Sequence, residues 1–210
     1  KIITLEISVC RNRFRECKSM GSILYREKTF ITEMVNSTRP VIDFDIYVMD
    51  ENLFRIAGTG FYEQYVGVVL SPGCACDYVL KTGKPVIIYD PIENPICSEC
   101  RMKHLCFREY MILYPIINDG KTIGVVGLGA FDDDKKEKFK KMEDKLCSYL
   151  GNLCSLISAK VRESEYSNTI EKIINTVDDS IMLVDYEGQV LFYNKKAIKY
   201  FIEEKTQMNI

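Results

Sequence analysis

Apolar residues in the first part of the chain recur at steps of three and four, which is the spacing of one face of an α-helix. The recurring positions are Ile3, Ile7, Cys10, Phe14, Cys17 and Leu24. Gly21 stands in the one gap of this pattern, where we expect the helix to break. Arg39 precedes Pro40, and the residue before a proline is disfavoured in the α region. Residues 1–39 are therefore predicted to form an N-terminal helical segment.

The apolar period changes to two after Pro40, which is typical of a β-strand. Every second residue from Ile42 to Val48 is apolar, a turn follows at 50–52, and 53–57 is expected to return as the second strand of a hairpin. The other elements expected in this region are a helix over 74–81, a strand over 85–89 and a second hairpin over 111–131. The pattern predicts an α+β fold with an antiparallel sheet.

A long helix is expected from the three aspartates at 132–134 to about Val177, because acidic residues favour a helix N-terminus. Its apolar stripe consists of Phe139, Met142, Leu146, Leu150, Leu153, Ile157 and Val161. A polar stretch at 162–168 interrupts the stripe and marks the predicted domain boundary. Beyond it we expect two strands around a turn at 186–188, followed by a helix after Asn194.

Composition excludes several classes of protein. The 210 residues are 47% hydrophobic and 28% charged, which is ordinary for a globular domain and not for a disordered chain. A net charge of -2 gives no field that would attract nucleic acid or anionic lipid. No apolar run reaches the length of a membrane span and no signal peptide is evident, so we expect a cytoplasmic protein. Because the chain begins at Lys1, we expect it to be a piece of a longer protein.

Cysteine is abundant, with nine residues of two kinds. Cys10, Cys17, Cys147 and Cys154 lie in helical patterns and are expected to act as small apolar core residues. The other five lie in loops or at a helix start: Cys74, Cys76, Cys97, Cys100 and Cys106. Three of these five fall in the stretch 90–108, which has no periodicity and is long for a connection without a function.

The loop cysteines predict a metal centre, because four thiolates satisfy either a tetrahedral zinc ion or an iron-sulfur cluster. The expected ligands are Cys76, Cys97, Cys100 and Cys106, with Cys74 in reserve. Iron-sulfur is favoured over zinc, since the C-x2-C-x5-C spacing is not that of a zinc ribbon. Reactive redox thiols or a reversible disulfide are the alternative. The only histidine, His104, has no orienting partner, so thiol or serine catalysis is not expected.

Two segments followed by a long helix resemble a GAF domain over residues 40–160. They are VLKTGKPVIIYD at 79–90 and YPIINDGKTIGVVGLGAF at 114–131. The resemblance implies a sensor domain with a small-molecule pocket between its sheet and helices. Four tyrosines are possible lining residues of such a pocket: Tyr62, Tyr65, Tyr78 and Tyr89.

The run TIEKIINTVDDSIMLVDYEGQVLFYNKKAIKYF at 169–201 is similar to the opening of a PAS domain. This implies a connecting helix over 161–178 and an incomplete PAS domain over 179–210. The segment ISVCRNRFRECKSMG at 7–21 resembles the N-terminal region of bacterial sigma-54-dependent activators. That resemblance implies a sensory input region that regulates transcription and is not an enzyme, with its ATPase and DNA-binding domains outside these residues.

The helical seams at 3–24 and 139–161 are expected to pack against each other and against a second copy, which predicts a homodimer. Two alternatives to metal sensing stay open. The first is a metabolite-binding module with structural zinc or free redox-active thiols. The second is an interaction module without any ligand.

Overall fold

The computed structural model describes residues 21–100 and 110–200. The predicted helix over 1–20, His104 and the candidate ligand Cys106 lie outside the described residues. Two compact units divide the chain between Val161 and Arg162, and each is described by itself.

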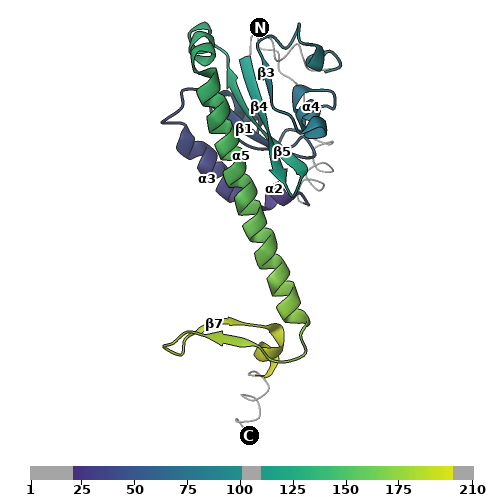
Figure 1. Cartoon of the computed structure of the whole chain (residues 1–210), viewed down its shortest axis with the longest axis vertical. Helices are drawn as coiled ribbons and strands as arrows, with labels where there is room; N and C mark the ends of the chain where they lie inside the picture. Colours follow the sequence, from purple (N-terminus) through teal and green to yellow (C-terminus); the bar gives the residue numbers. More distant parts are fainter. Residues whose placement is uncertain (1–20, 101–109, 201–210) are drawn as a thin grey trace. The chain divides into compact units, whose positions relative to one another are not determined.

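The first unit contains a five-stranded antiparallel sheet in the order β2-β1-β5-β4-β3 (Figure 1). Its strands are β1 (Asp45–Asp50), β2 (Arg55–Gly58), β3 (Val86–Ile88), β4 (Tyr110–Asn118) and β5 (Lys121–Ala130). Both predicted hairpins are present. Asp119 and Gly120 join β4 to β5 with φ values of 47° and 75°, as a two-residue turn with positive φ at both positions requires.

Helices cover both faces of the sheet (Figure 1). The helices α2 (Ile23–Arg26), α3 (Lys28–Thr38) and α5 (Asp133–Thr176) pack on one face, where they share a core with Ile46 and Val126. The helix α4 (Ala75–Thr82) and the 3-10 helices η1 (Gly60–Tyr65) and η2 (Pro95–Cys97) contribute to a second core on the other face. Because both faces are covered, β1 is buried on both sides, and its Tyr47 belongs to the second core.

The predicted helix boundaries have local causes. Cys74 is the N-cap of α4, and Gly83 ends it with φ 65°, a left-handed conformation that glycine adopts without strain. The helix α3 ends at Thr38, two residues before Pro40. The apolar stripe of α5 is buried at every predicted position except Met142, which is partly buried.

The second unit begins in α5 and contains β6 (Met182–Val184) and β7 (Val190–Tyr193), which pair antiparallel, followed by helical residues 195–200. The buried Asn194 holds this unit together through its side-chain amide. Its oxygen accepts from the backbone N–H groups of Ile181 and Ala197, and its nitrogen donates to the carbonyl groups of Ile174 and Asp179. These elements agree with the predicted pattern, while the resemblance to a PAS domain stays a prediction. None of the described helices is long and apolar enough to cross a membrane.

Candidate functional site

Four cysteines from two separate segments line one internal cavity of about 50 Å³ in the second core. Cys74 and Cys76 come from the start of α4, whereas Cys97 and Cys100 come from η2 and the turn after it. Each of the four is at most 8% exposed. The structure therefore brings together the described cysteines that the sequence singled out, including the reserve ligand Cys74. The remaining lining residues are Tyr47, Tyr62, Leu70, Ala75, Pro91 and Met111.

Local hydrogen bonds hold the two segments in place. The Asp77 carboxylate accepts from the Gly73 backbone N–H at 2.8 Å and from Lys81 Nζ at 2.7 Å, which fixes the turn that enters α4. The Asn94 side chain accepts from the backbone N–H of Ile96 at 3.0 Å and caps η2. A Cβ atom at Gly73 would lie 3.2 Å from the Glu99 carbonyl oxygen, so glycine permits the close approach of the two segments.

The two thiols at the start of α4 have opposite pKa shifts. A hydrogen bond from Cys76 lowers the pKa of Cys74 to about 7, and the backbone N–H groups at the helix start act in the same direction. The hydrogen bond to Cys74 and complete burial raise the pKa of Cys76 well above its ordinary value. The pair therefore stabilises one thiolate next to one protonated thiol.

A buried arginine lies behind the cavity wall. The Arg55 guanidinium stacks over the rings of Tyr47, Tyr62 and Tyr65 at 4.8, 5.1 and 5.6 Å from their centroids. Tyr47 in turn forms a hydrogen bond with the Cys76 sulfur at 3.4 Å. This arrangement places a positive charge near the thiols. Sequence analysis missed Arg55, because only the fold brings a strand residue and three tyrosines together.

The same cysteines are candidate donors for a metal. Soft thiol donors suit zinc and iron-sulfur clusters. Within residues 21–100 and 110–200, however, no group of three or more His, Cys, Asp or Glu side chains is arranged to hold a metal ion. The cavity, at about 50 Å³, is small for a multi-iron cluster.

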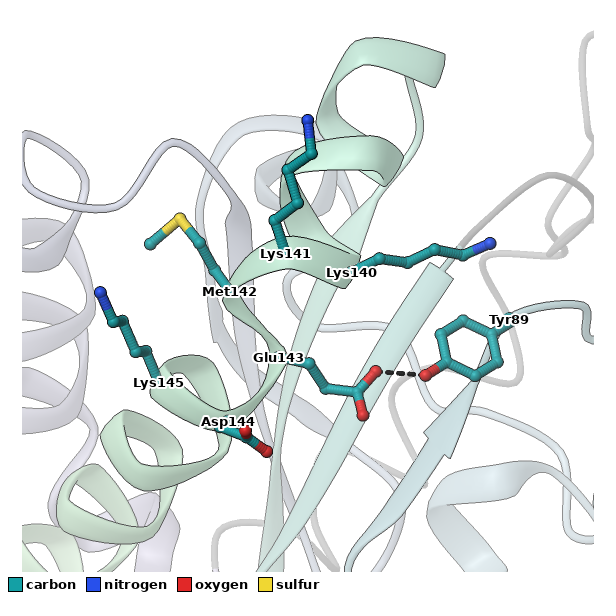
Figure 2. Close-up of a pocket in the computed structure, with 7 residues that line it drawn as sticks. All are labelled: Tyr89, Lys140, Lys141, Met142, Glu143, Asp144 and Lys145. Carbon is teal, nitrogen blue, oxygen red and sulfur yellow. Dashed lines mark hydrogen bonds between the residues drawn. The ribbon is translucent and has the colours of Figure 1, made fainter.

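The four candidate tyrosines do not share one pocket. Tyr62 lines the cysteine cavity and Tyr65 lies near it against Arg55. Tyr78 lies outside the cavity, along a groove between α4 and residues 95–99. Tyr89 donates a hydrogen bond to Glu143 of α5, and Lys140 lies over its ring (Figure 2).

The depression at Tyr89 has a volume of about 660 Å³, but the rest of its lining comes from the consecutive residues 140–145 of α5 (Figure 2). A ligand there would contact one helix and one ring, so water would not be excluded. The cysteine cavity is the better candidate site.

The groove beside Tyr78 has a volume of about 370 Å³. Its walls include Asp77 and Lys81 of α4 and Ser98 and Glu99 of the opposite segment. Cys74 lines both this groove and the inner cavity.

The sequence profile of the GAF domain family matches residues 20–157. The chain belongs to the GAF domain family. The expected resemblance is thereby confirmed, and the cysteine cavity lies within this GAF domain. The match does not extend to the strands β6 and β7.

Among curated proteins, the chain is similar to UacR of Escherichia coli K12, which is provisionally named a uric acid sigma-54-dependent transcriptional regulator. Identity is 25% over 190 residues, which cover 88% of this chain and 32% of UacR. The chain thus spans about a third of the length of this relative.

Several solved structures resemble the GAF domain. The type II free methionine-R-sulfoxide reductase of Thermoplasma acidophilum is 20% identical, with 65% of this chain and 95% of that one covered and a TM-score of 0.42. The A. aeolicus nlh2 GAF domain in an inactive state is 18% identical, with coverage of 72% and 99% and a TM-score of 0.41. The E. coli DhaR(N)-DhaL complex is 14% identical, with coverage of 91% and 66% and a TM-score of 0.42.

Proposed function

We propose that this chain is the sensory input region of a bacterial sigma-54-dependent transcriptional regulator and that it responds to redox state through the thiols of the cysteine cavity. The similarity to UacR supports the regulatory part of this proposal. The single observation that carries the sensing part is that four buried cysteines from two segments line one cavity.

The size of the cysteine cavity argues against a metabolite bound inside it as the signal. Pockets for small organic ligands have volumes of roughly 300–1,000 Å³, whereas this cavity has about 50 Å³. A purine such as the one in the name of UacR would not fit between these residues without opening the core.

The mechanism begins at the pair Cys74 and Cys76. Oxidation joins their sulfur atoms in a disulfide, releases two protons and passes two electrons to the oxidant. The hydrogen bond between Tyr47 and the Cys76 thiol is then lost, because a disulfide sulfur is a poor partner for a hydroxyl group. Tyr47 belongs to β1, which lies between β2 and β5, so the change enters an inner strand of the sheet.

Thiol mapping tests this function. The reduced chain is equilibrated in buffers of increasing redox potential, remaining thiols are alkylated, and disulfides are located by mass spectrometry. We expect one two-electron transition in which the free thiols of Cys74 and Cys76 disappear together. The matched control Cys147→Ser should leave this transition unchanged. Full alkylation of Cys74 and Cys76 at potentials that oxidise ordinary surface dithiols would contradict the proposal.

A metal centre is the second candidate function, because four thiols line one cavity and the further expected ligand Cys106 lies outside the described residues. Cys76, Cys97, Cys100 and Cys106 would hold an iron-sulfur cluster or a zinc ion, with Cys74 as the reserve ligand. A bound centre would supply a redox-active or structural cross-link between α4 and the segment 90–108. Metal and sulfide analysis of protein purified without oxygen tests this candidate. Stoichiometric metal that is lost in Cys100→Ala supports it, and metal retained in that variant contradicts the ligand set.

The proposed regulator acts as a homodimer and passes its signal to ATPase and DNA-binding domains outside this chain. Exposed apolar residues support a helical dimer contact, since Tyr166, Ile170 and Ile173 of α5 recur at steps of four and three. Sedimentation analysis of the chain with and without Ile170→Glu tests this contact. A wild-type monomer would contradict it.

A further inference from the structure

The groove between α4 and residues 95–99 shares one lining cysteine, Cys74, with the cysteine cavity. Cys74 lines both, whereas Cys76, Cys97 and Cys100 line the cavity and not this groove. At about 370 Å³ the groove is within the size range of small-molecule sites, unlike the cavity behind it. Of the four cavity cysteines, Cys74 is therefore the one that a reagent in this groove can contact.

Both walls of the groove carry charged side chains. Lys81 lies on the α4 wall with its side chain 69% exposed, and Glu99 lies on the opposite wall. Asp77 is already held by Lys81 and by the Gly73 N–H. The Lys81 ammonium has three donors, so it can bind a second carboxylate. A ligand with an ammonium and a carboxylate group matches both walls.

We propose that this groove binds a small amino-acid disulfide of the cystine type and directs it to Cys74. The inference rests on the redox function proposed above and adds the chemical class of the oxidant. The ligand carboxylate pairs with Lys81 and its ammonium group with Glu99, which brings the disulfide bond to the Cys74 sulfur.

The reaction is two thiol-disulfide exchanges. The Cys74 thiolate attacks one sulfur of the ligand, a mixed disulfide forms, and the other half leaves as a thiolate. Cys76 loses its proton and attacks the Cys74 sulfur, which releases the second half as a thiolate. Both released thiolates take up protons from solvent. The two cysteines of the protein are oxidised by two electrons, the ligand disulfide is reduced to two thiols, and the event is stoichiometric.

The identity of the attacking thiol is tested with the reduced 210-residue chain, cystine as the probe, and mass spectrometry. The wild-type chain should form a Cys74–Cys76 disulfide and release two cysteines. Cys76→Ser should accumulate a single mixed disulfide on Cys74, because the second attack is blocked. Adducts on Cys97 or Cys100 in that variant would overturn the inference.

The role of the groove charges is tested by comparing cystine with bis(2-hydroxyethyl) disulfide, a small uncharged disulfide. We expect Lys81→Met to lower the ratio of the cystine rate to the rate with the uncharged probe by about tenfold, the effect of losing one charge-assisted contact. Glu99→Gln should lower the same ratio. Lys121→Met removes an exposed lysine from the β4–β5 turn and should leave it unchanged. Lys81→Met also removes a hydrogen-bond partner of Asp77. Any resulting change in the reactivity of the Cys74 thiol affects both probes equally, so it cancels in the ratio of the two rates.

The outcomes distinguish a failure of this inference from a failure of the redox function on which it rests. In one outcome, both probes form the Cys74–Cys76 disulfide, and Lys81→Met and Glu99→Gln change the two rates by the same factor. The groove then has no preference for the charged disulfide, so the inference is wrong while the redox function stands. If neither probe oxidises a cavity thiol, both fall.

Discussion

At the scale of single residues, Tyr47 connects the buried arginine to the thiols. Its hydroxyl group lies 3.4 Å from the Cys76 sulfur, and its ring lies under the Arg55 guanidinium. Gly127 on the neighbouring strand leaves room for this ring, because a Cβ atom there would overlap it. The position of the Cys76 hydrogen bond therefore depends on a glycine that is remote in sequence.

Replacing Gly127 by alanine should displace the Tyr47 ring. We expect a loss of about 1–3 kcal/mol in the free energy of unfolding, the usual cost of overpacking a core. Gly151→Ala is the matched control, since its Cβ atom would meet Tyr114 at an ordinary 3.6 Å inside α5. Urea unfolding of both variants measures the difference. Equal stability of the two variants would contradict the packing described for Tyr47.

The pKa of about 7 at Cys74 predicts its reaction with alkylating reagents. Only the thiolate reacts, so a lower pKa shifts the reaction to lower pH. The iodoacetamide rate at Cys74 should be half-maximal near pH 7. Burial raises the pKa of Cys154 to about 12, so that thiol should stay unreactive throughout the neutral range. Site-resolved labelling between pH 6 and about pH 9 checks both, and a midpoint for Cys74 at the upper limit would disprove the shift.

At the scale of elements, α4 and the hairpins could be predicted because their signals are local. Gly83 ends α4, and Asp119 with Gly120 forms the turn that joins β4 to β5. The gathering of Cys74 and Cys97 around one cavity was expected from the sequence, but the shape and size of that cavity were not, since they depend on how distant segments pack. Burial of Tyr47 on the second face of β1 was missed for the same reason.

Asp77 stabilises the start of α4 in a way that depends on pH. Burial alone would raise the pKa of this carboxyl group, but the hydrogen bonds from Lys81 and the Gly73 N–H outweigh burial and lower it. A lowered pKa means that the stabilisation is present above the ordinary pKa and is lost as the pH falls through the lowered value. Asp77→Asn should thus cost about 1 kcal/mol at neutral pH.

The difference in stability between Asp77→Asn and the wild type should be smaller in acid. Thermal unfolding at pH 7 and at about pH 3 measures the two differences. A constant difference at both values would show that the charge of Asp77 contributes nothing.

At the scale of the whole molecule, the core of the GAF domain ends where α5 passes Val161. The buried positions of α5 run from Phe139 to Val161, and the described residues after Arg162 are mainly exposed. The division into two units falls at the same place. The first unit therefore contains the residues that stabilise it.

A fragment that ends at Val161 should keep the fold of the first unit. We expect its melting temperature to differ from that of the whole chain by less than about 3 °C, because the buried residues of both core clusters lie before Arg162. A fragment of residues 162–210 should show no cooperative unfolding, as a two-stranded hairpin is marginal alone. Calorimetry of the two fragments checks both expectations. A much lower melting temperature for the first fragment than for the whole chain would contradict the division into two units.

The central claim is that oxidation of the cavity thiols changes the state of the sheet. Hydrogen exchange of the reduced and oxidised 210-residue chain tests it most directly. We predict altered amide protection in β1 and at the start of α4 after the Cys74–Cys76 disulfide forms, and no change in Cys76→Ser treated in the same way. Identical protection in the two forms, with the disulfide verified by mass spectrometry, would contradict the claim.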